Sequence, residues 1–344
     1  MNNLLGLIAA FLASFFLLYA LVSKDQPAKH AGLKSVGLPP LLAIHDLYAA
    51  SSALPRHDKE PNIGLTSGTE IGWRQRYGNR NGSTIRLALP LTGPDPGPLP
   101  MVVVIESGAE SGISADRKRT ELFLTNRGYA VLSIACRGAS SANLALGAPL
   151  DATRESSCGA AMIRDEVMLR IEQGIADPKA LAVLGSGMGA RLALMTMVLE
   201  PDLFKAAILH SAVIDMPRPL PGRQSVMTPF KAVVTSVQGT GDGDVMPLIV
   251  ASPFELAKSI RGAVLITHGK ADEVAPVEHA EAFARALRRA GKDVEAAYFN
   301  HEDHCYSLWQ TRVQTARLSE SFLAHHLGGR NGGYDFIELL AKLF

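Results

Sequence analysis

One short stretch, residues 181–194 (LAVLGSGMGARLAL), constrains the fold of this chain more than any other. An apolar run stops there at a cluster of small residues, and a helix-forming run begins immediately afterwards. The pattern predicts a strand, a very tight turn and a helix. The turn, residues 185–189 (GSGMG), has the small-residue frame of the nucleophile elbow G-x-S-x-G. Its central position, where that frame carries a serine, is occupied by Gly187.

Strand-like and helix-like segments alternate along most of the chain on both sides of this turn. Two further strands, at residues 70–77 and 83–89, precede the alternation and are joined by a turn at 79–82. The alternation predicts a parallel sheet with right-handed crossovers, which the two early strands extend as an antiparallel edge. We therefore expect an α/β fold with an eight-stranded, mostly parallel sheet and helices on both faces. The buried strands are expected at residues 101–106, 129–135, 181–184, 206–210, 263–267 and 294–299, and the main helices at 116–126, 160–175, 190–199, 277–290 and 307–326.

Polar segments follow two of the later strands at the points where function is expected. In such a sheet, functional residues gather at the carboxyl ends of the strands. Asp272 comes shortly after the strand at 263–267, and His304 comes shortly after the strand at 294–299. The chain order of elbow, acid and histidine is that of an α/β-hydrolase triad. The sequence therefore predicts an α/β-hydrolase fold in which Gly187 stands at the nucleophile position.

Several motifs resemble those of a known peptidase family. The region from about residue 83 to residue 327 resembles the catalytic domain of the prolyl-oligopeptidase family of serine peptidases. The resemblance implies that Asp272 is the orienting acid and His304 the general base. It also makes Met188, Ser107 and Gly108 candidates for the oxyanion hole. The motifs that carry it are residues 174–185 (GIADPKALAVLG), 200–207 (EPDLFKAA), 252–254 (SPF), 268–272 (HGKAD) and 302–304 (EDH).

The sequence departs from the pattern of that family in three ways. The nucleophile is replaced by Gly187, and the family's His-Gly-Gly-Pro segment reads ESGA at residues 106–109. A carboxylate at Glu106 beside an oxyanion hole would oppose the negative charge that the hole stabilises. Residues 24–68 are too few for the β-propeller that gates peptide access in the family. The elbow itself is compatible with glycine, because glycine readily enters the backbone conformation that strains other residues there.

The N-terminus differs from the rest of the chain. Residues 4–22 are mostly apolar, and the first charged side chain is Lys24. At about 1.5 Å per residue this run just spans a hydrocarbon core of roughly 30 Å. We expect a single-pass membrane anchor at residues 1–23; the alternative, a cleaved signal peptide, lacks a basic first segment and a clear cleavage site. Lysines shortly after the run favour a cytoplasmic body over a periplasmic or other extracytoplasmic one.

The expected organisation is therefore an anchor, a connecting segment and one catalytic-type domain. Residues 24–68 form a proline-rich linker with a short helix at 41–51, and residues 69–328 form the hydrolase domain. Residues 329–344 form a C-terminal tail that ends in a short amphipathic piece.

Composition and spacing argue against other classes of protein. The net charge of +1 gives no basis for a nucleic-acid partner. Three scattered cysteines predict no disulfide framework, and we expect no cofactor and no metal. The glycines of the turn also fit a dinucleotide fingerprint, but that motif belongs in a first βαβ unit. His301 and His304 could suggest a metal site, although adjacent loop residues seldom converge on one ion. Ser186 is the nearest hydroxyl to the elbow centre, but its side chain should point another way.

Three functional hypotheses remain. The favoured one is a membrane-anchored, catalytically impaired relative of these peptidases that acts as a binding, scaffolding or assembly protein. Its partner would be a protein, or a peptide or ester ligand. The second is an active hydrolase in which His304, oriented by Asp272, activates a water molecule. In the third, glycine has replaced the serine of an otherwise normal peptidase or esterase. If the serine is lost, Asp272 and His304 could also be simply a structural pair.

Overall fold

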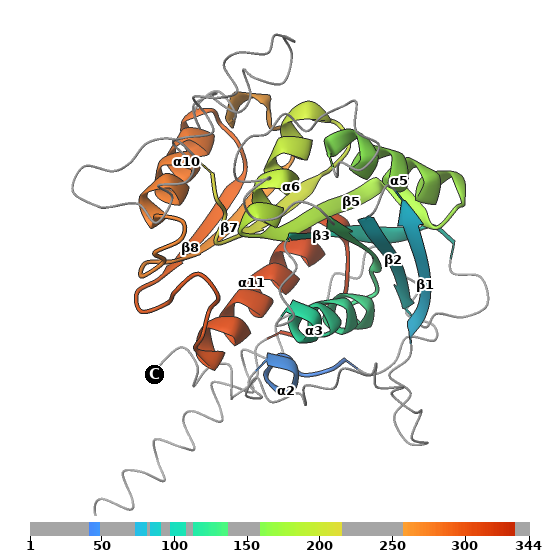
Figure 1. The fold of residues 1–344 in the computed structure, drawn as a ribbon, viewed down its shortest axis with the longest axis horizontal. Helices are drawn as coiled ribbons and strands as arrows, with labels where there is room; N and C mark the ends of the chain where they lie inside the picture. The colour runs from blue at the N-terminus through green and yellow to red at the C-terminus, as the bar shows by residue number, and fades with distance from the viewer. Residues whose placement is uncertain are drawn as a thin grey trace, which may run out of the picture.

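The computed structural model describes residues 41–48, 73–80, 83–90, 97–107, 113–136, 159–214 and 257–333. Its strands form one eight-stranded sheet in the order β1-β2-β4-β3-β5-β6-β7-β8 (Figure 1). The strands are β1 (Trp73–Arg80), β2 (Ser83–Pro90), β3 (Leu99–Ser107), β4 (Ala130–Cys136), β5 (Ala176–Ser186), β6 (Ala206–His210), β7 (Ala263–Gly269) and β8 (Val294–Phe299). The helices are α2 (Ile44–Tyr48), α3 (Ile113–Asn126), α5 (Ala160–Glu172), α6 (Met188–Leu199), α10 (Val277–Arg289) and α11 (Trp309–Leu327).

Most of the sheet is parallel. All neighbouring strands from β4 to β8 in the sheet order pair in parallel, whereas β2 pairs antiparallel with both β1 and β4. This arrangement confirms the predicted mostly parallel sheet of an α/β-hydrolase, with the two early strands as its antiparallel edge. The strands β6 and β8 begin and end at the predicted residues.

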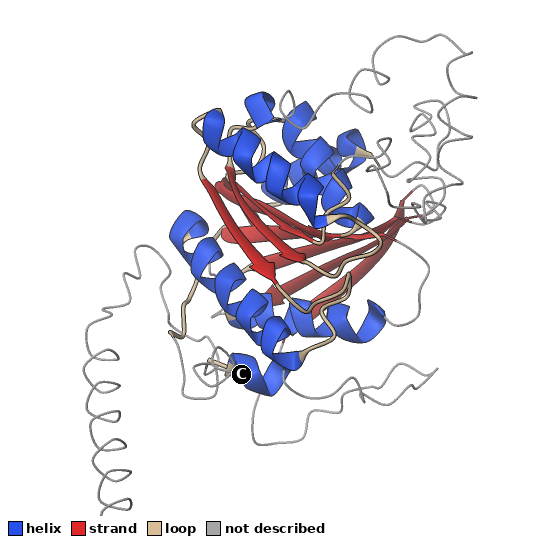
Figure 2. Cartoon of the chain, turned by 90° about the vertical axis from the view of Figure 1, so that its left-hand side faces the viewer, coloured by secondary structure: helices blue, strands red, loops and turns tan. Residues whose placement is uncertain are grey.

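Helices cover both faces of the sheet and create two separate hydrophobic cores (Figure 2). Helices α5, α6 and α10 supply one core, and α2, α3 and α11 supply the other. Strand β3 contributes to both, because its successive side chains point to opposite faces: Val103 lies in the first core and Val104 in the second. A strand buried on both faces needs the continuous β-branched run that the sequence has at this point.

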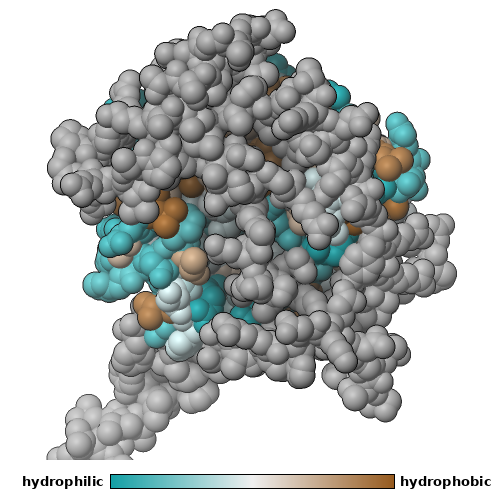
Figure 3. All heavy atoms as spheres, in the orientation of Figure 1, coloured by the Kyte–Doolittle hydropathy of each residue, from teal (hydrophilic) through white to brown (hydrophobic). Residues whose placement is uncertain are grey.

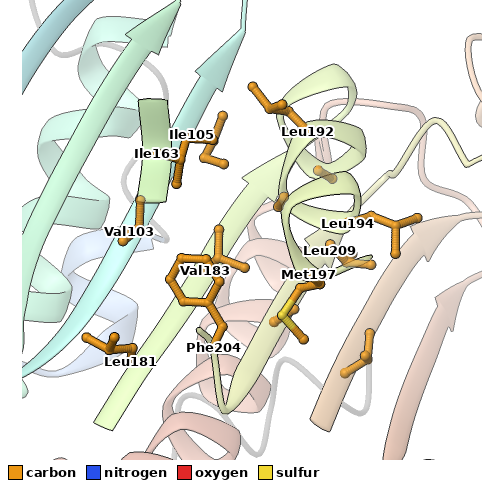
Figure 4. Packing of buried hydrophobic residues seen from close by; sticks show 14 of the residues in the cluster. Val103, Ile105, Ile163, Leu181, Val183, Leu192, Leu194, Met197, Phe204 and Leu209 are labelled. Carbon is orange, nitrogen blue, oxygen red and sulfur yellow. The ribbon is translucent and has the colours of Figure 1, made fainter. Parts of the chain in front are cut away.

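The first core surrounds the strand that leads to the elbow. Figure 4 shows Val183 of β5 lying among side chains from β3, α5 and α6, with Phe204 and Met197 beside it. Val183 is fully buried. Burial of a side chain of this kind stabilises the fold by about 1.5–3 kcal/mol, so β5 is a rigid support for the residues at its carboxyl end.

Strand β5 is longer than the sequence predicted. We expected a strand at 181–184, but the strand runs from Ala176 to Ser186. Pairing with β3 is irregular there, since Leu99 pairs with Ala176 and Met101 pairs with Leu181. Asp177 accepts a hydrogen bond from the backbone N–H of Lys179, which makes a local turn. The residues just before the predicted strand therefore form a bulge within the observed one.

Two segments that we assigned outside the domain contact it. Within the predicted linker, α2 packs against α3 and α11, and its Ile44 is fully buried. At the start of the predicted tail, the N–H of Arg330 donates to the carbonyl of Arg127 and that of Gly332 to the carboxylate of Glu320. The predicted membrane anchor and the amphipathic end of the tail lie outside the described residues. Within the part of the chain that the structure describes, no helix is long and apolar enough to cross a membrane.

The exposed surface of the described residues is mixed in character. On the face shown in Figure 3, hydrophobic and hydrophilic residues lie side by side. The exposed large hydrophobic residues are spread from the segment before α2 to the segment before α11, and such scattered residues need no binding partner to explain them. They are Leu41, Met168, Leu169, Leu199, Val274 and Leu308.

Candidate functional site

The elbow joins β5 directly to α6. Gly187 is buried and has φ 55° and ψ −116°, a conformation that residues with a Cβ rarely adopt. The flanking glycine Gly185 is also required, because a Cβ there would come within 2.4 Å of the backbone of Gly189. The strand and the helix thus approach each other more closely than any side chain would allow. The local geometry is that of a nucleophile elbow whose central residue has no side chain.

Backbone hydrogen bonds from β6 and the segment after it hold the elbow. The N–H of Gly187 donates to the carbonyl of His210 at 2.9 Å, and the N–H of Val213 donates to the carbonyl of Gly187 at 3.3 Å. Met188 is the first residue of α6. Its N–H therefore has no acceptor within the helix and lies at the positive end of the helix dipole. No acceptor for it is found among the described residues, so it can bind the oxygen of a carbonyl group or an anion.

Asp272 is a buried carboxylate with several hydrogen-bond donors. Its Oδ1 accepts from the backbone N–H groups of Val274 and Ala275, both at 2.8 Å. Its Oδ2 lies 2.8 Å from His304 Nδ1 and 3.1 Å from His268 Nε2. Burial alone would raise the pKa of Asp272, but the hydrogen bonds from His268, His304 and Ala275 outweigh it and hold the pKa well below its usual value. Asp272 is therefore ionised at neutral pH.

His304 faces both Asp272 and the elbow. Because the ionised carboxylate can only accept, Nδ1 of His304 carries the proton, and in the neutral ring Nε2 is left as an acceptor. A Cβ added to Gly187 would lie 2.9 Å from that Nε2. The basic nitrogen thus points at the position where a nucleophile side chain would begin. The structure brings together all three predicted residues, Gly187, Asp272 and His304.

The loops that carry the acid and the histidine are joined to each other. The N–H of Lys270 donates to the carbonyl of Phe299 at 2.8 Å, and that of Ala271 donates to the carbonyl of Glu302 at 2.9 Å. The Glu302 side chain is buried and accepts from the N–H of Leu308 at 3.0 Å. Backbone and side-chain hydrogen bonds therefore hold Asp272 and His304 in place before any ligand binds, which is the preorganisation that a catalytic or binding site requires.

Glu106 forms an ion pair with a partner that the sequence did not reveal. Its carboxylate lies 2.6 Å from Arg86 Nη2 on β2, and Arg86 also binds Glu121 of α3 at 2.9 Å. Burial lowers the pKa of Arg86, but the charges of Glu106 and Glu121 outweigh it and raise the pKa above its usual value. We argued from the sequence that a carboxylate at Glu106 would oppose the charge that an oxyanion hole stabilises. The ion pair weakens that objection, because Arg86 offsets part of the negative charge of Glu106 and Glu121.

The other candidate residues are placed less completely. Ser107 is the last residue of β3, and Gly108 lies outside the described residues. Ser186 is exposed and, within the described part of the chain, makes no hydrogen bond to His304. His301 is exposed, and Asp303 accepts hydrogen bonds from Cys305 and Ser307. Within the described ranges, no cluster of three possible metal-binding side chains is present.

Sequence reasoning missed one side chain that contacts the acid. His268 is fully buried, and its Nε2 lies 2.8 Å from the carbonyl of Ala275. A carbonyl only accepts, so Nε2 carries the proton and also faces Asp272. The residue stands in the HGKAD motif at 268–272, but the pattern alone gives no reason to assign it a contact with the carboxylate.

Comparisons with known proteins agree with this geometry. The sequence model of the prolyl oligopeptidase family matches residues 116–330. Dipeptidyl aminopeptidase BIII of Pseudoxanthomonas mexicana is 24% identical over 242 residues, which cover 68% of this chain and 34% of that protein. The acylamino-acid-releasing enzyme of Arabidopsis thaliana is 25% identical over 232 residues, covering 63% of this chain and 29% of the enzyme. The chain thus spans about a third of the length of these relatives.

Solved structures show the same fold. A puromycin-hydrolyzing peptidase of Mycobacterium tuberculosis superimposes with a TM-score of 0.56 at 20% identity, over 77% of this chain and 41% of that one. An acylaminoacyl peptidase of Pyrococcus horikoshii gives a TM-score of 0.56 at 18% identity, over 78% of this chain and 44% of that one.

Proposed function

This chain belongs to the prolyl oligopeptidase family, and we propose that it binds peptide or acyl ligands at the elbow without forming an acyl-enzyme. The observation that carries the proposal is the geometry around Gly187. The backbone keeps the elbow conformation and His304 Nε2 points at it, but no side chain is present to attack a carbonyl carbon. Covalent catalysis in this family type needs a nucleophile at that position and a base beside it.

The remaining parts of the site suit ligand binding. The N-terminus of α6 offers the N–H of Met188 to a carbonyl oxygen or a carboxylate. His304 is partly exposed and offers its Nε2 to a donor on the ligand. Asp272 keeps the orientation of that ring through its hydrogen bond to Nδ1. A peptide supplies both an acceptor carbonyl and a donor N–H, so the two protein groups match one peptide unit.

Labelling with a fluorophosphonate probe tests the proposal. The purified full chain should show no covalent adduct by mass spectrometry, because the probe reacts with an activated serine. The matched variant Gly187→Ser should be labelled at residue 187, and Gly187→Ala should not. Labelling of the unaltered chain at Ser186 or at any other hydroxyl, or peptidase turnover that His304→Ala abolishes, would overturn the proposal.

A second function is favoured by one specific observation, the complete His304–Asp272 pair. Asp272 is ionised and fully hydrogen-bonded, and the ring nitrogen that faces the elbow is the basic one. In this alternative His304 removes a proton from water as the water oxygen attacks the carbonyl carbon of a bound ester or amide, and the leaving group departs with that proton. Turnover of short esters without a burst, lost in both His304→Gln and Asp272→Asn, would favour it over simple binding.

A membrane location is part of the proposal. It rests on the apolar residues 4–22 and the lysines that follow them. The full chain should sediment with membranes and resist extraction by carbonate at high pH, whereas a chain with two apolar residues of that run replaced by arginine should not. Extraction of both forms alike would refute an anchor there.

A further inference from the structure

Three polar side chains next to the elbow, those of His210, Thr267 and Tyr306, are linked in series by hydrogen bonds; we call them the polar chain. His210 Nδ1 lies 2.7 Å from the hydroxyl of Thr267, and the same hydroxyl lies 2.8 Å from the phenol oxygen of Tyr306. His210 and Thr267 are register partners at the ends of β6 and β7. Tyr306 comes from the loop between β8 and α11. The polar chain therefore connects β6 and β7 to the loop that carries His304.

Both ends of this polar chain reach the candidate site. At one end, the carbonyl of His210 accepts the N–H of Gly187 at 2.9 Å. At the other end, Tyr306 follows His304 by two residues. The polar chain thus links His210, whose carbonyl bonds the elbow, to Tyr306, which lies in the same loop as the base His304.

Tyr306 has an unusual backbone conformation that its neighbours enforce. Its φ is 54°, which is rare for a residue with a side chain. The buried ring makes edge contacts with the rings of Phe299 and His210, at centroid distances of 5.7 and 6.3 Å. Arg312 Nη1 donates to the carbonyl of Tyr306 at 3.1 Å. Strained conformations of this kind persist only where the surroundings over-determine them, and they cluster at functional sites.

The three groups are uncharged at neutral pH. Burial raises the pKa of Tyr306 to about 12 and lowers the pKa of His210 to about 4. The third member, Thr267, is a neutral hydroxyl. The polar chain therefore acts through hydrogen-bond geometry and not through charge.

We propose that Tyr306 is a positioning residue: its hydroxyl bonds Thr267, which His210 bonds in turn, and so fixes the loop in the position where His304 bonds Asp272 through Nδ1 and faces Gly187 through Nε2. Without that bond the loop loses a side-chain hydrogen bond to β7 that is made two residues from the base. The ring of His304 would then sample other orientations. The inference holds whether the site hydrolyses its ligand or only binds it.

The test is a proton signal from His304 itself. The full chain is labelled with ¹⁵N-histidine, and the Nδ1–H signal of His304 is assigned by its loss in His304→Gln. Tyr306→Phe deletes one hydroxyl and keeps the ring. We expect the Nδ1 proton to exchange with solvent about fivefold to tenfold faster in this variant, as for the loss of one ordinary hydrogen bond. The matched control is Tyr298→Phe in the partly buried Tyr298. It removes a hydroxyl whose buried oxygen has no hydrogen-bond partner among the described residues, and it should leave the rate unchanged.

Conservative variants separate positioning from general stability. Thr267→Ser keeps the hydroxyl and should keep the slow exchange, whereas Thr267→Val should match Tyr306→Phe. This pair decides the question if Tyr306→Phe does not fold. Equal exchange rates in Tyr306→Phe, Tyr298→Phe and the unaltered chain would overturn the proposal, as would the absence of a protected His304 signal in the unaltered chain. Fluorophosphonate labelling of that chain would instead refute the proposed function and leave this inference intact.

Discussion

Restoring a side chain at Gly187 should cost stability, and the structure indicates how much. At φ 55° and ψ −116° a residue with a Cβ is strained by about 1–3 kcal/mol. The new Cβ would also stand 2.9 Å from His304 Nε2, closer than ordinary van der Waals contact. The imidazole is the far end of a flexible side chain, so a shift of a few tenths of an ångström relieves the contact at small cost. We therefore expect Gly187→Ala to lose about 1–3 kcal/mol.

Gly187→Ser should lose less than Gly187→Ala, although serine is larger. Its hydroxyl can donate to Nε2 of His304, and one hydrogen bond of this kind returns about 0.5–1.5 kcal/mol. The order of stability should be glycine, then serine, then alanine. Only a base already aimed at residue 187 predicts that order.

Thermal unfolding of each full-length variant in one buffer measures these stability differences. For a domain of this size, each kcal/mol lost should lower Tm by about 2–4 °C. The control is Gly291→Ala, at φ 68° with nothing within 4 Å of the added Cβ, which isolates the cost of positive φ. A Gly187→Ala variant as stable as the unaltered chain would refute the elbow conformation. Serine and alanine variants of equal stability would refute the position of His304.

Two further predictions concern groups around the site. Because desolvation lowers the pKa of the partly buried His210 to about 4, the unfolded chain binds up to one more proton than the folded chain between pH 4 and about 6.5. Stability should therefore fall as the pH falls through that window. Urea midpoints should show a flatter decline in His210→Gln, and identical slopes would contradict the desolvation of this ring. Arg86→Met should lose about 3–5 kcal/mol because it leaves Glu106 and Glu121 without their cation. The control is the exposed ion pair between Arg261 and Asp202, for which Arg261→Met should change stability by less than about 1 kcal/mol. Equal losses of stability in the two variants would show that the ion pairs of Arg86 with Glu106 and Glu121 are not buried.

The fold was predictable because it depends on local patterns of residues that can be recognised in the sequence. Continuous apolar runs mark the strands buried on both faces, and the order of elbow, acid and histidine along the chain identifies the edge of the sheet where they meet. The bulge in β5 was not predictable, because Asp177-Pro178 has the composition of a turn and only pairing with β3 on both sides of it keeps the strand continuous.

Side-chain partnerships depended on the tertiary structure. The sequence indicated no partner for Glu106; in the structure, Arg86 of β2 bonds both Glu106 and Glu121 of α3. Likewise, nothing near His304 in the sequence predicts that Tyr306 bonds Thr267, which lies 39 residues away, or that Thr267 in turn bonds His210.

By itself, the sequence determined the class of sheet, the elbow and the absence of a nucleophile at its centre, since each of these depends on the types and spacing of neighbouring residues. Only the tertiary structure decided which nitrogen of His304 faces Gly187 and what holds it there. Those contacts depend on strand order and register, which bring together residues that no local pattern relates.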